Sequence, residues 1–167
     1  MAERPIVCSS VVLVEEIGGR YPGFLLQERP DLPGQLVHPG KWHFFGGHAN
    51  EGDDRWSTIF REVLDEEAKL RLSRPGSWAE WQHIEQGRYD GTDRHGKSVI
   101  RIVNLFHLVL PEATLTLEEK GALVTIPKTV EAIEANRERL TEYAYTHLLA
   151  RMKGEGPWKK TESGIWK

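Results

Sequence analysis

The sequence has a single cysteine, Cys8, no long apolar run and no excess of basic residues. A lone cysteine cannot form an intrachain disulfide, which favours a reducing compartment. No apolar stretch approaches the length of a membrane span, and the opening MAERP is unlike a signal peptide. A net charge of −3 argues against a nucleic-acid backbone as partner, because such binding usually needs a basic patch. We therefore expect a cytoplasmic protein that binds neither membrane nor nucleic acid.

The chain length favours one domain. Its 167 residues can bury a hydrophobic core without disulfides or metals as staples. No repeat or interdomain linker interrupts the chain, so we expect a single domain over residues 1–153. Residues 154–167 form a polar tail with two tryptophans, which is either disordered or packed on the domain as a strap. A homodimer built on this tail or on the tryptophan-rich segment 77–82 is one option for its assembly.

The pattern of apolar residues predicts a sheet with helices. β-Branched and alternating apolar residues indicate strands, and the glycine- and proline-rich segments between them indicate turns and loops. Strands are expected over residues 5–16, 23–29, 42–45, 77–91 and 97–110, with a further short strand and loop over 114–127. The turn over 17–23 makes the first two strands a hairpin, and apolar spacing over 127–153 is helical. This order predicts an α/β or α+β layered domain with a mixed sheet.

The segment GGHANEGDDRWSTIFREVLDEEAKL, residues 46–70, combines a glycine pair with an acidic helical pattern. Asp53 or Asp54 suits the N-cap of the helix, where a carboxylate accepts backbone amides. At about 100° per residue, one apolar stripe forms from Trp56, Ile59, Phe60 and Val63. The carboxylates on roughly the opposite side are Glu62, Asp65 and Glu66.

Three carboxylates at these spacings repel one another. Each like-charge pair costs a few tenths of a kcal/mol, and a helix selected for stability alone would place lysines between them. A hard divalent cation reverses this cost, because Mg²⁺ and Mn²⁺ prefer carboxylate oxygens. The alternative is an ordinary solvated acidic face, which is common on amphipathic helices.

The fixed spacing around these acids resembles the Nudix box, G-x5-E-x7-R-E-U-x-E-E-x-G-U, where U is a bulky apolar residue. The positions that match outright are Gly47, Arg61, Glu62, Val63 and Glu66. Asp53 and Asp65 stand where the family has Glu, and Ala68 stands where it has the closing Gly. The match runs in register without gaps over residues 47–69, and the order of elements resembles the Nudix fold over most of residues 5–152.

The resemblance implies a Nudix-type α/β/α sandwich that holds Mg²⁺ or Mn²⁺ on the helix of the box. By similarity the metal ligands are Glu62, Asp65 and Glu66. Glu66 is also a candidate general base, and Arg61 is expected to pair with a box carboxylate such as Asp53. A further acid outside the box often joins such a site. Glu119 is preferred over Glu118 for this role, and an exposed loop acid is the alternative.

The same resemblance implies hydrolysis of a nucleoside diphosphate linked to another moiety, with a nucleotide as substrate. Gly46 and Gly47 would let the backbone turn beside the phosphates, and His48 and Arg29 are candidate phosphate contacts. Solvent-exposed positions are the alternative for both side chains. In WHFF, residues 42–45, alternation predicts that one pair of aromatic residues faces the core and the other a cleft.

Two other functions compete with the hydrolase. One alternative is a Nudix-like nucleotide-binding module with weak or no turnover. Asp53 and Asp65 are shorter than the glutamates of the family, and displacing a carboxylate by about an ångström can impair a metal site. A structural domain with an incidental acidic helix is the other alternative. The isomerase branch of the family requires a catalytic cysteine, and Cys8 lies in the first strand, away from the box.

Overall fold

A computed structural model describes residues 4–16, 23–28, 40–60, 70–72, 81–92, 95–110, 115–117 and 123–159. Its main sheet has seven strands. Five of them lie side by side in the order β3 (Trp42–His43), β2 (Gly23–Glu28), β1 (Ile6–Glu16), β7 (Ser98–Leu110) and β6 (Trp81–Thr92). Off this path, β4 (Phe45–His48) pairs with β1, and β9 (Leu123–Ile126) pairs with β2. β1 and β7 run parallel and the other pairs are antiparallel, so the mixed sheet is confirmed.

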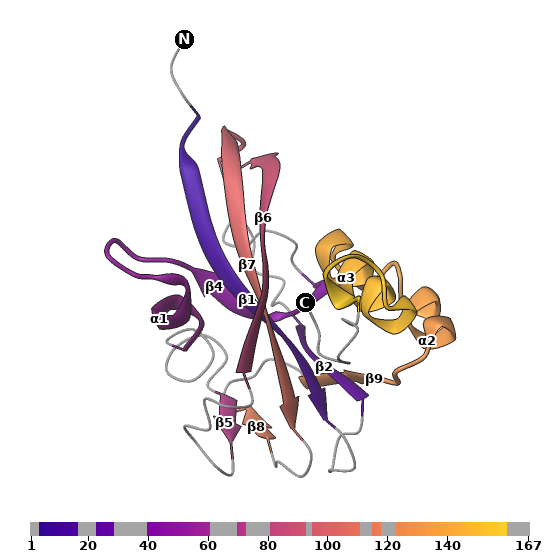
Figure 1. Cartoon of the computed structure of the whole chain (residues 1–167). Coiled ribbons are helices and arrows are strands. Elements are labelled where there is room, and N and C mark those ends of the chain that lie inside the picture. The colour runs from indigo at the N-terminus through magenta and orange to yellow at the C-terminus, as the bar shows by residue number, and fades with distance from the viewer. Residues whose placement is uncertain are drawn as a thin grey trace.

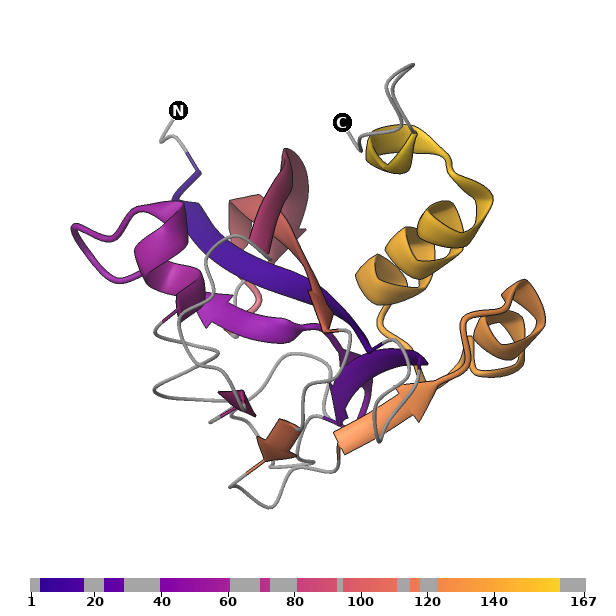
Figure 2. The same ribbon diagram turned by 60° about the horizontal axis from the view of Figure 1, so that its bottom comes forward.

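Helices cover both faces of this sheet, as Figures 1 and 2 show. α1 (Arg55–Phe60) lies on one side, and α2 (Val130–Ala135) and α3 (Glu142–Lys153) lie on the other. A small second sheet pairs β5 (Leu70–Leu72) with β8 (Leu115–Leu117), and a short 3₁₀ helix, η3 (Gly156–Trp158), follows α3. The predicted α/β/α layering is therefore confirmed. Within the described residues, no helix is long and apolar enough to cross a membrane.

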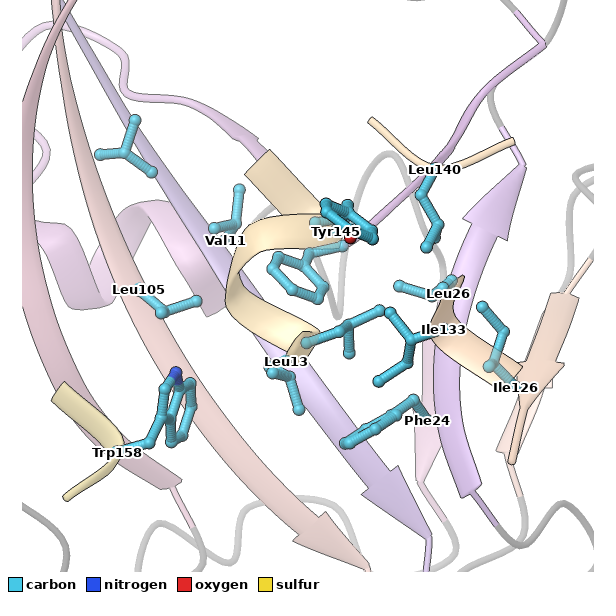
Figure 3. Close-up of a cluster of buried hydrophobic side chains, with 14 residues drawn as sticks. Val11, Leu13, Phe24, Leu26, Leu105, Ile126, Ile133, Leu140, Tyr145 and Trp158 are labelled. Atoms are coloured by element: carbon cyan, nitrogen blue, oxygen red, sulfur yellow. The ribbon is translucent and has the colours of Figure 1, made fainter. Parts of the chain in front are cut away.

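Alternation along the strands assigns the core residues to the two faces. Val11 and Leu13 of β1 point to the α3 side, where they join Leu105 of β7 in a buried cluster with α2, α3 and η3 (Figure 3). Val12 of β1 and Phe106 of β7 are buried toward α1 instead. Burying such apolar side chains contributes roughly 1.5–3 kcal/mol each. Both faces of the central strands are therefore covered.

The helical spacing predicted over residues 127–153 is confirmed and is divided between two helices. α2 ends at Asn136, whose side-chain amide donates to the carbonyl of Ala132. α3 begins after Thr141, whose hydroxyl accepts the amide of Ala144 as an N-cap. Between the two helices, Leu140 forms a β-bridge with Trp42. The capping residues Asn136 and Thr141, with the β-bridge between them, therefore interrupt the helix although the apolar spacing continues.

A buried ion pair fastens the end of α3 to the sheet. Glu15 of β1 is 1% exposed, and its Oε1 lies 2.7 Å from Nε of Arg151 and 3.2 Å from Nε2 of His107. The ring of Trp158 in η3 is 0% exposed and packs edge-on against His107. Within the predicted tail, residues 154–159 are thus placed against the domain by Trp158, which favours the strap for that part. Residues 160–167 lie outside the described part of the chain.

The segment 42–45 does not form one short strand. It is divided between β3 and β4 at Phe44, and β4 continues through the glycine pair to His48. Because the strand breaks at Phe44, the alternation expected for Trp42 to Phe45 is lost. Phe44 is buried on the α3 side and Phe45 is buried beside Val12, so both phenylalanines belong to the core.

Candidate functional site

The glycine pair is held against the central strand. Gly46 pairs with Val11 and Gly47 pairs with Ser10 in the antiparallel β1–β4 register. Gly46 has φ of 150°, and a Cβ placed there would lie 2.1 Å from the carbonyl oxygen of Ser10. No side chain fits at this position, so glycine is required for the close approach of the two strands. The pair lies in a strand of the sheet rather than in a free loop.

A tight turn connects the glycine pair to α1. The carboxylate of Asp53 accepts the amide of Asn50 at 2.9 Å, and the amide of Asp53 donates to the carbonyl of Asn50 at 3.0 Å. Asp54 is the N-cap, because its Oδ1 accepts the amide of Ser57 at 2.7 Å. This backbone hydrogen bond holds the pKa of Asp54 below its usual value. Of the two candidate caps, Asp54 therefore begins the helix and Asp53 closes the turn before it.

The apolar stripe predicted for the helix packs on the sheet. Ile59 is fully buried, the ring of Trp56 lies 4.6 Å from that of Phe106, and Phe60 lies 5.0 Å from Trp81. These three members of the stripe are confirmed as sheet-facing residues. Thr58 is also buried, and its hydroxyl donates to the carbonyl of Asp54.

Most of the predicted site residues lie outside the described part of the chain. Residues 61–69 are among them, so the predictions for Arg61, Glu62, Asp65, Glu66 and Ala68 stay predictions. The same holds for Arg29 and Glu119. Among the described residues, no group of three histidine, cysteine or acidic side chains is arranged to hold a metal ion. The described residues of the predicted site are Gly46, Gly47, His48 and Asp53, and His48 is an exposed residue at the end of β4.

An aromatic and polar cluster on the α3 side was not predicted from the sequence. We call it the Tyr143 cluster; it consists of His43, Glu85, Tyr89, Tyr143 and His147. Tyr143 is central, with its ring 6.1 Å from His43, 5.8 Å from Tyr89 and 4.5 Å from His147. His43 also contacts the hydroxyl of the N-cap Thr141 through Nδ1, at 2.6 Å. The available signal was the i, i+4 spacing of Tyr143 and His147, which places both on one helix face.

Burial controls the charge of this cluster. It lowers the pKa of His147 to about 4, so the imidazole is neutral near pH 7. It raises the pKa of Glu85, whose Oε1 lies 3.3 Å from Nε2 of His147. Burial also raises the pKa of Tyr143, which keeps its hydroxyl protonated. Neither this hydroxyl nor Nδ1 of His147 has a hydrogen-bond partner among the described residues. The cluster therefore offers aromatic faces together with two buried, unpaired polar atoms.

Comparison with known proteins identifies the fold. The sequence matches the family description "NUDIX domain" over residues 6–155. No curated protein matches the sequence. The structure is similar to that of a MutT protein from Methanosarcina mazei Go1, with 23% identity, a TM-score of 0.58 and coverage of 92% of this chain and 96% of that one.

Two further structures extend this likeness. One is a bifunctional NMN adenylyltransferase/ADP ribose pyrophosphatase from Francisella tularensis, solved in complex with AMP and a Mn ion. It is 20% identical with a TM-score of 0.61, and the alignment covers 93% of this chain but 44% of that chain. The other is the NUDIX domain of Shewanella oneidensis NrtR complexed with ADP ribose, at 9% identity, a TM-score of 0.59 and coverage of 92% and 88%. At these identities the structures show a common fold.

Proposed function

Because the chain belongs to the Nudix family of pyrophosphohydrolases, we propose that it uses Mg²⁺ or Mn²⁺ to hydrolyse a nucleoside diphosphate linked to another moiety. The observation that carries this proposal is the box itself. From Gly47 to Glu66 every acidic position of the pattern keeps a carboxylate, in register, inside the matched range 6–155. A helix under selection for stability alone would not retain three mutually repelling acids at these spacings.

The proposed metal ligands are Glu62, Asp65 and Glu66, with Glu119 as a fourth. All four are carboxylates, and such hard oxygen donors suit Mg²⁺ and Mn²⁺. The metal, when bound, would neutralise phosphate charge and lower the pKa of the attacking water. Glu66 is the proposed acceptor of the water proton, and Arg61 is proposed to pair with Asp53 and brace the turn before α1.

Substrate would lie between the glycine pair and the Tyr143 cluster. Gly46 and Gly47 are proposed to lie beside the phosphates, and His48 and Arg29 are proposed phosphate contacts. We assign the nucleoside side of the substrate to the Tyr143 cluster, which adjoins β3 through His43 and has two polar atoms to satisfy. Candidate substrates are nucleotide sugars, ADP-ribose, dinucleoside polyphosphates and nucleoside triphosphates.

The purified protein should cleave at least one of these compounds in a screen that supplies Mg²⁺ and Mn²⁺ in separate reactions. Glu66→Gln should then lower kcat by at least about 100-fold, because it removes both a metal ligand and the proposed base. Glu131→Gln is the matched control, since it makes the same change on the exposed first turn of α2. Absence of cleavage with either metal, or equal rates for Glu66→Gln and wild type, would contradict the proposal.

A nucleotide-binding module without turnover is the second candidate. The observation in its favour is that Asp53 and Asp65 are each one methylene shorter than the family's glutamate, and Ala68 replaces the closing glycine. It predicts stabilisation of the fold by ADP-ribose or another nucleotide with no product formed. Restoring Asp53→Glu and Asp65→Glu separates the two candidates, because a large gain in rate would identify a weakened enzyme.

A further inference from the structure

β6 is the edge strand of the main sheet. Within the described residues it pairs with β7 on one side and with no strand on the other. In Figure 1 the end of β6 that leads into the turn to β7 projects past α3. An edge strand presents a row of unpaired backbone amides and carbonyls, to which a strand of another chain can add. This edge can therefore accept one further strand.

The hydrogen bonds of β7 determine which residues of β6 point to the open edge. The amide of Ile100 donates to the carbonyl of Pro5, so the backbone groups of Ile100 point toward β1. Those of Arg101 point toward β6 instead, because successive residues of a strand direct their amides and carbonyls to opposite sides. Arg101 faces Tyr89 in the β6–β7 register. The backbone groups of Tyr89 therefore point to β7, and those of the residues on either side of it point to the open edge.

The sequence of this edge is complementary to itself. Residues 87–91 read GRYDG, so Tyr89 is flanked first by Arg88 and Asp90 and then by two glycines. If two copies pair antiparallel about a two-fold axis at Tyr89, Arg88 of each copy lies directly opposite Asp90 of the other. The backbone groups of both residues point to the edge, so the two form a hydrogen-bonded pair as well as an ion pair. Opposite charges directly across two strands stabilise the pairing.

Charge and hydrogen bonding disfavour the neighbouring registers. A two-fold axis at Arg88 would place two arginines opposite each other, and an axis at Asp90 would do the same with two aspartates. An axis between two residues would match outward backbone groups with inward ones, because only alternate residues point to the edge. Among these registers, the one centred on Tyr89 satisfies both the charges and the hydrogen bonds.

The side chains leave room for such an interface. Tyr89 is a large apolar side chain that is 37% exposed, on the face of the sheet that α3 covers. Its ring lies over Gly87 of the same strand, where a Cβ would be 2.6 Å from the tyrosine hydroxyl. In the two-fold register Gly87 faces the partner's Gly91, so no other side chain competes with the two rings. Asp90 already pairs with Arg4 at 2.6 Å, but its side chain is 82% exposed and can accept a second cation.

We propose that the β6 edge joins two copies of this chain into an antiparallel homodimer with its two-fold axis at Tyr89. The main sheets of the two copies become continuous across the interface, and Arg88 and Asp90 make two symmetric ion pairs. A single pair of strands buries a small area, so the dimer forms and separates with protein concentration. The Tyr89 ring also contacts Tyr143, so the interface borders the Tyr143 cluster of each copy.

The test is a charge exchange, with sedimentation velocity measured up to millimolar protein concentration. Wild type should shift from monomer to dimer as the concentration rises. Arg88→Asp should raise the dimer dissociation constant by at least about tenfold, because each ion pair becomes a pair of aspartates. Arg88→Asp combined with Asp90→Arg should recover most of this loss, since the exchanged charges are again opposite. Arg4→Ala is the matched control, because it removes the other partner of Asp90 and should leave dimerisation unchanged.

A cysteine at the two-fold axis tests the register directly. In a Cys8→Ser background, Tyr89→Cys should form an intermolecular disulfide under mild oxidation, because the Cα atoms of a non-hydrogen-bonded pair lie about 4.5 Å apart. Arg88→Cys should cross-link much more slowly, since the two copies of this residue are diagonal neighbours about 7–8 Å apart. A wild-type chain that stays monomeric at every concentration would overturn the inference. So would a dimer that tolerates Arg88→Asp and does not cross-link at position 89, because its interface would lie elsewhere.

Discussion

The two helical layers are attached to the sheet in different ways. α3 has twelve residues with a cap at each end, and its buried face joins a core cluster that includes Trp158. Its C-terminal half is also fixed by Arg151, which pairs with the buried Glu15 and lies over the Trp158 ring. α1 is described over six residues, and its first turn is held by the N-cap Asp54 and by the hydroxyl of Ser10, which donates to the carbonyl of Arg55 at 2.9 Å.

Because the two helices are attached differently, substitutions near them should have different effects on stability and on helix orientation. Many apolar contacts and a buried charge pair hold α3, so losing any one of them lowers the free energy of unfolding without redirecting the helix. In the described residues of α1, apolar packing is combined with directional hydrogen bonds from Asp54 and Ser10 at its first turn, and the loss of such hydrogen bonds changes the orientation of a helix as well as its stability. Substitutions in the apolar core on the α3 side should therefore affect folding, whereas substitutions around α1 should, under the proposed function, affect metal binding and catalysis as well.

The sharpest contrast should come from one tryptophan on each side. Trp158→Ala should lower the free energy of unfolding by about 3–5 kcal/mol, because it removes a fully buried ring from the core cluster. Trp56→Ala should cost about 2 kcal/mol, since Trp56 is half-buried and packs mainly on Phe106 and Phe60. Urea unfolding followed by circular dichroism measures both. A larger loss for Trp56→Ala than for Trp158→Ala would invert the comparison.

Glu15 gives the α3 side a predictable pH dependence. Burial alone would raise its pKa, but the interaction with His107 and the charges of Arg151 and Lys128 outweigh burial and hold the pKa below its usual value of 4.5. The unfolded chain therefore takes up this proton at a higher pH than the folded chain. The stability that Glu15 contributes is complete above the usual value and is lost as the pH falls through the folded value.

Glu15→Gln should accordingly lower the free energy of unfolding at pH 7 by about 3 kcal/mol, the lower end of the range for breaking a buried pair, because Arg151 and Lys128 retain access to water. The gap between this variant and wild type should narrow as urea unfolding is repeated at falling pH. Glu131→Gln, on the surface of α2, should show no such gap at any pH. A gap that stays constant with pH would show that Glu15 does not titrate as argued.

The sequence predicts the sheet and the start of the box well, because both depend on local patterns. Alternation in β1 and β7 determines which residues face each helical layer, and the sequence predicts an acidic cap at Asp53 or Asp54, of which the structure selects Asp54. The break between α2 and α3 is harder to predict, because Leu140 fits the helical spacing but pairs with Trp42, which is far away in the sequence. A contact of this kind leaves no local signal.

The same limit explains what was missed at the site. The box is a contiguous motif of 23 residues, so its residues could be named from their match to the family pattern. Glu85 and His147 come from β6 and α3 and meet only after the β-bulge between His83 and Glu85 has turned that strand. The bond from Ser10 to Arg55 likewise joins segments whose relation is decided by the β1–β4 register. Long-range polar contacts therefore need the folded structure.

The smallest effect on stability is expected at Tyr143. Its hydroxyl is buried without a hydrogen-bond partner among the described residues, so Tyr143→Phe removes an unsatisfied group rather than a bond. The free energy of unfolding should stay within about 1 kcal/mol of wild type, or rise. If this hydroxyl donates to the nucleoside part of the substrate, the variant should raise KM by about 2- to 10-fold with kcat nearly unchanged.

Tyr145→Phe is the matched control, two residues along the same helix. Its hydroxyl already donates to Glu134 at 2.9 Å, so the substitution breaks an existing bond and should lower stability while leaving KM alone. The two variants should therefore differ in opposite ways: Tyr143→Phe should alter substrate binding, and Tyr145→Phe should alter stability. If Tyr143→Phe lowers stability and leaves KM unchanged, the hydroxyl has a partner within the protein, and the Tyr143 cluster belongs to the core rather than to the substrate site.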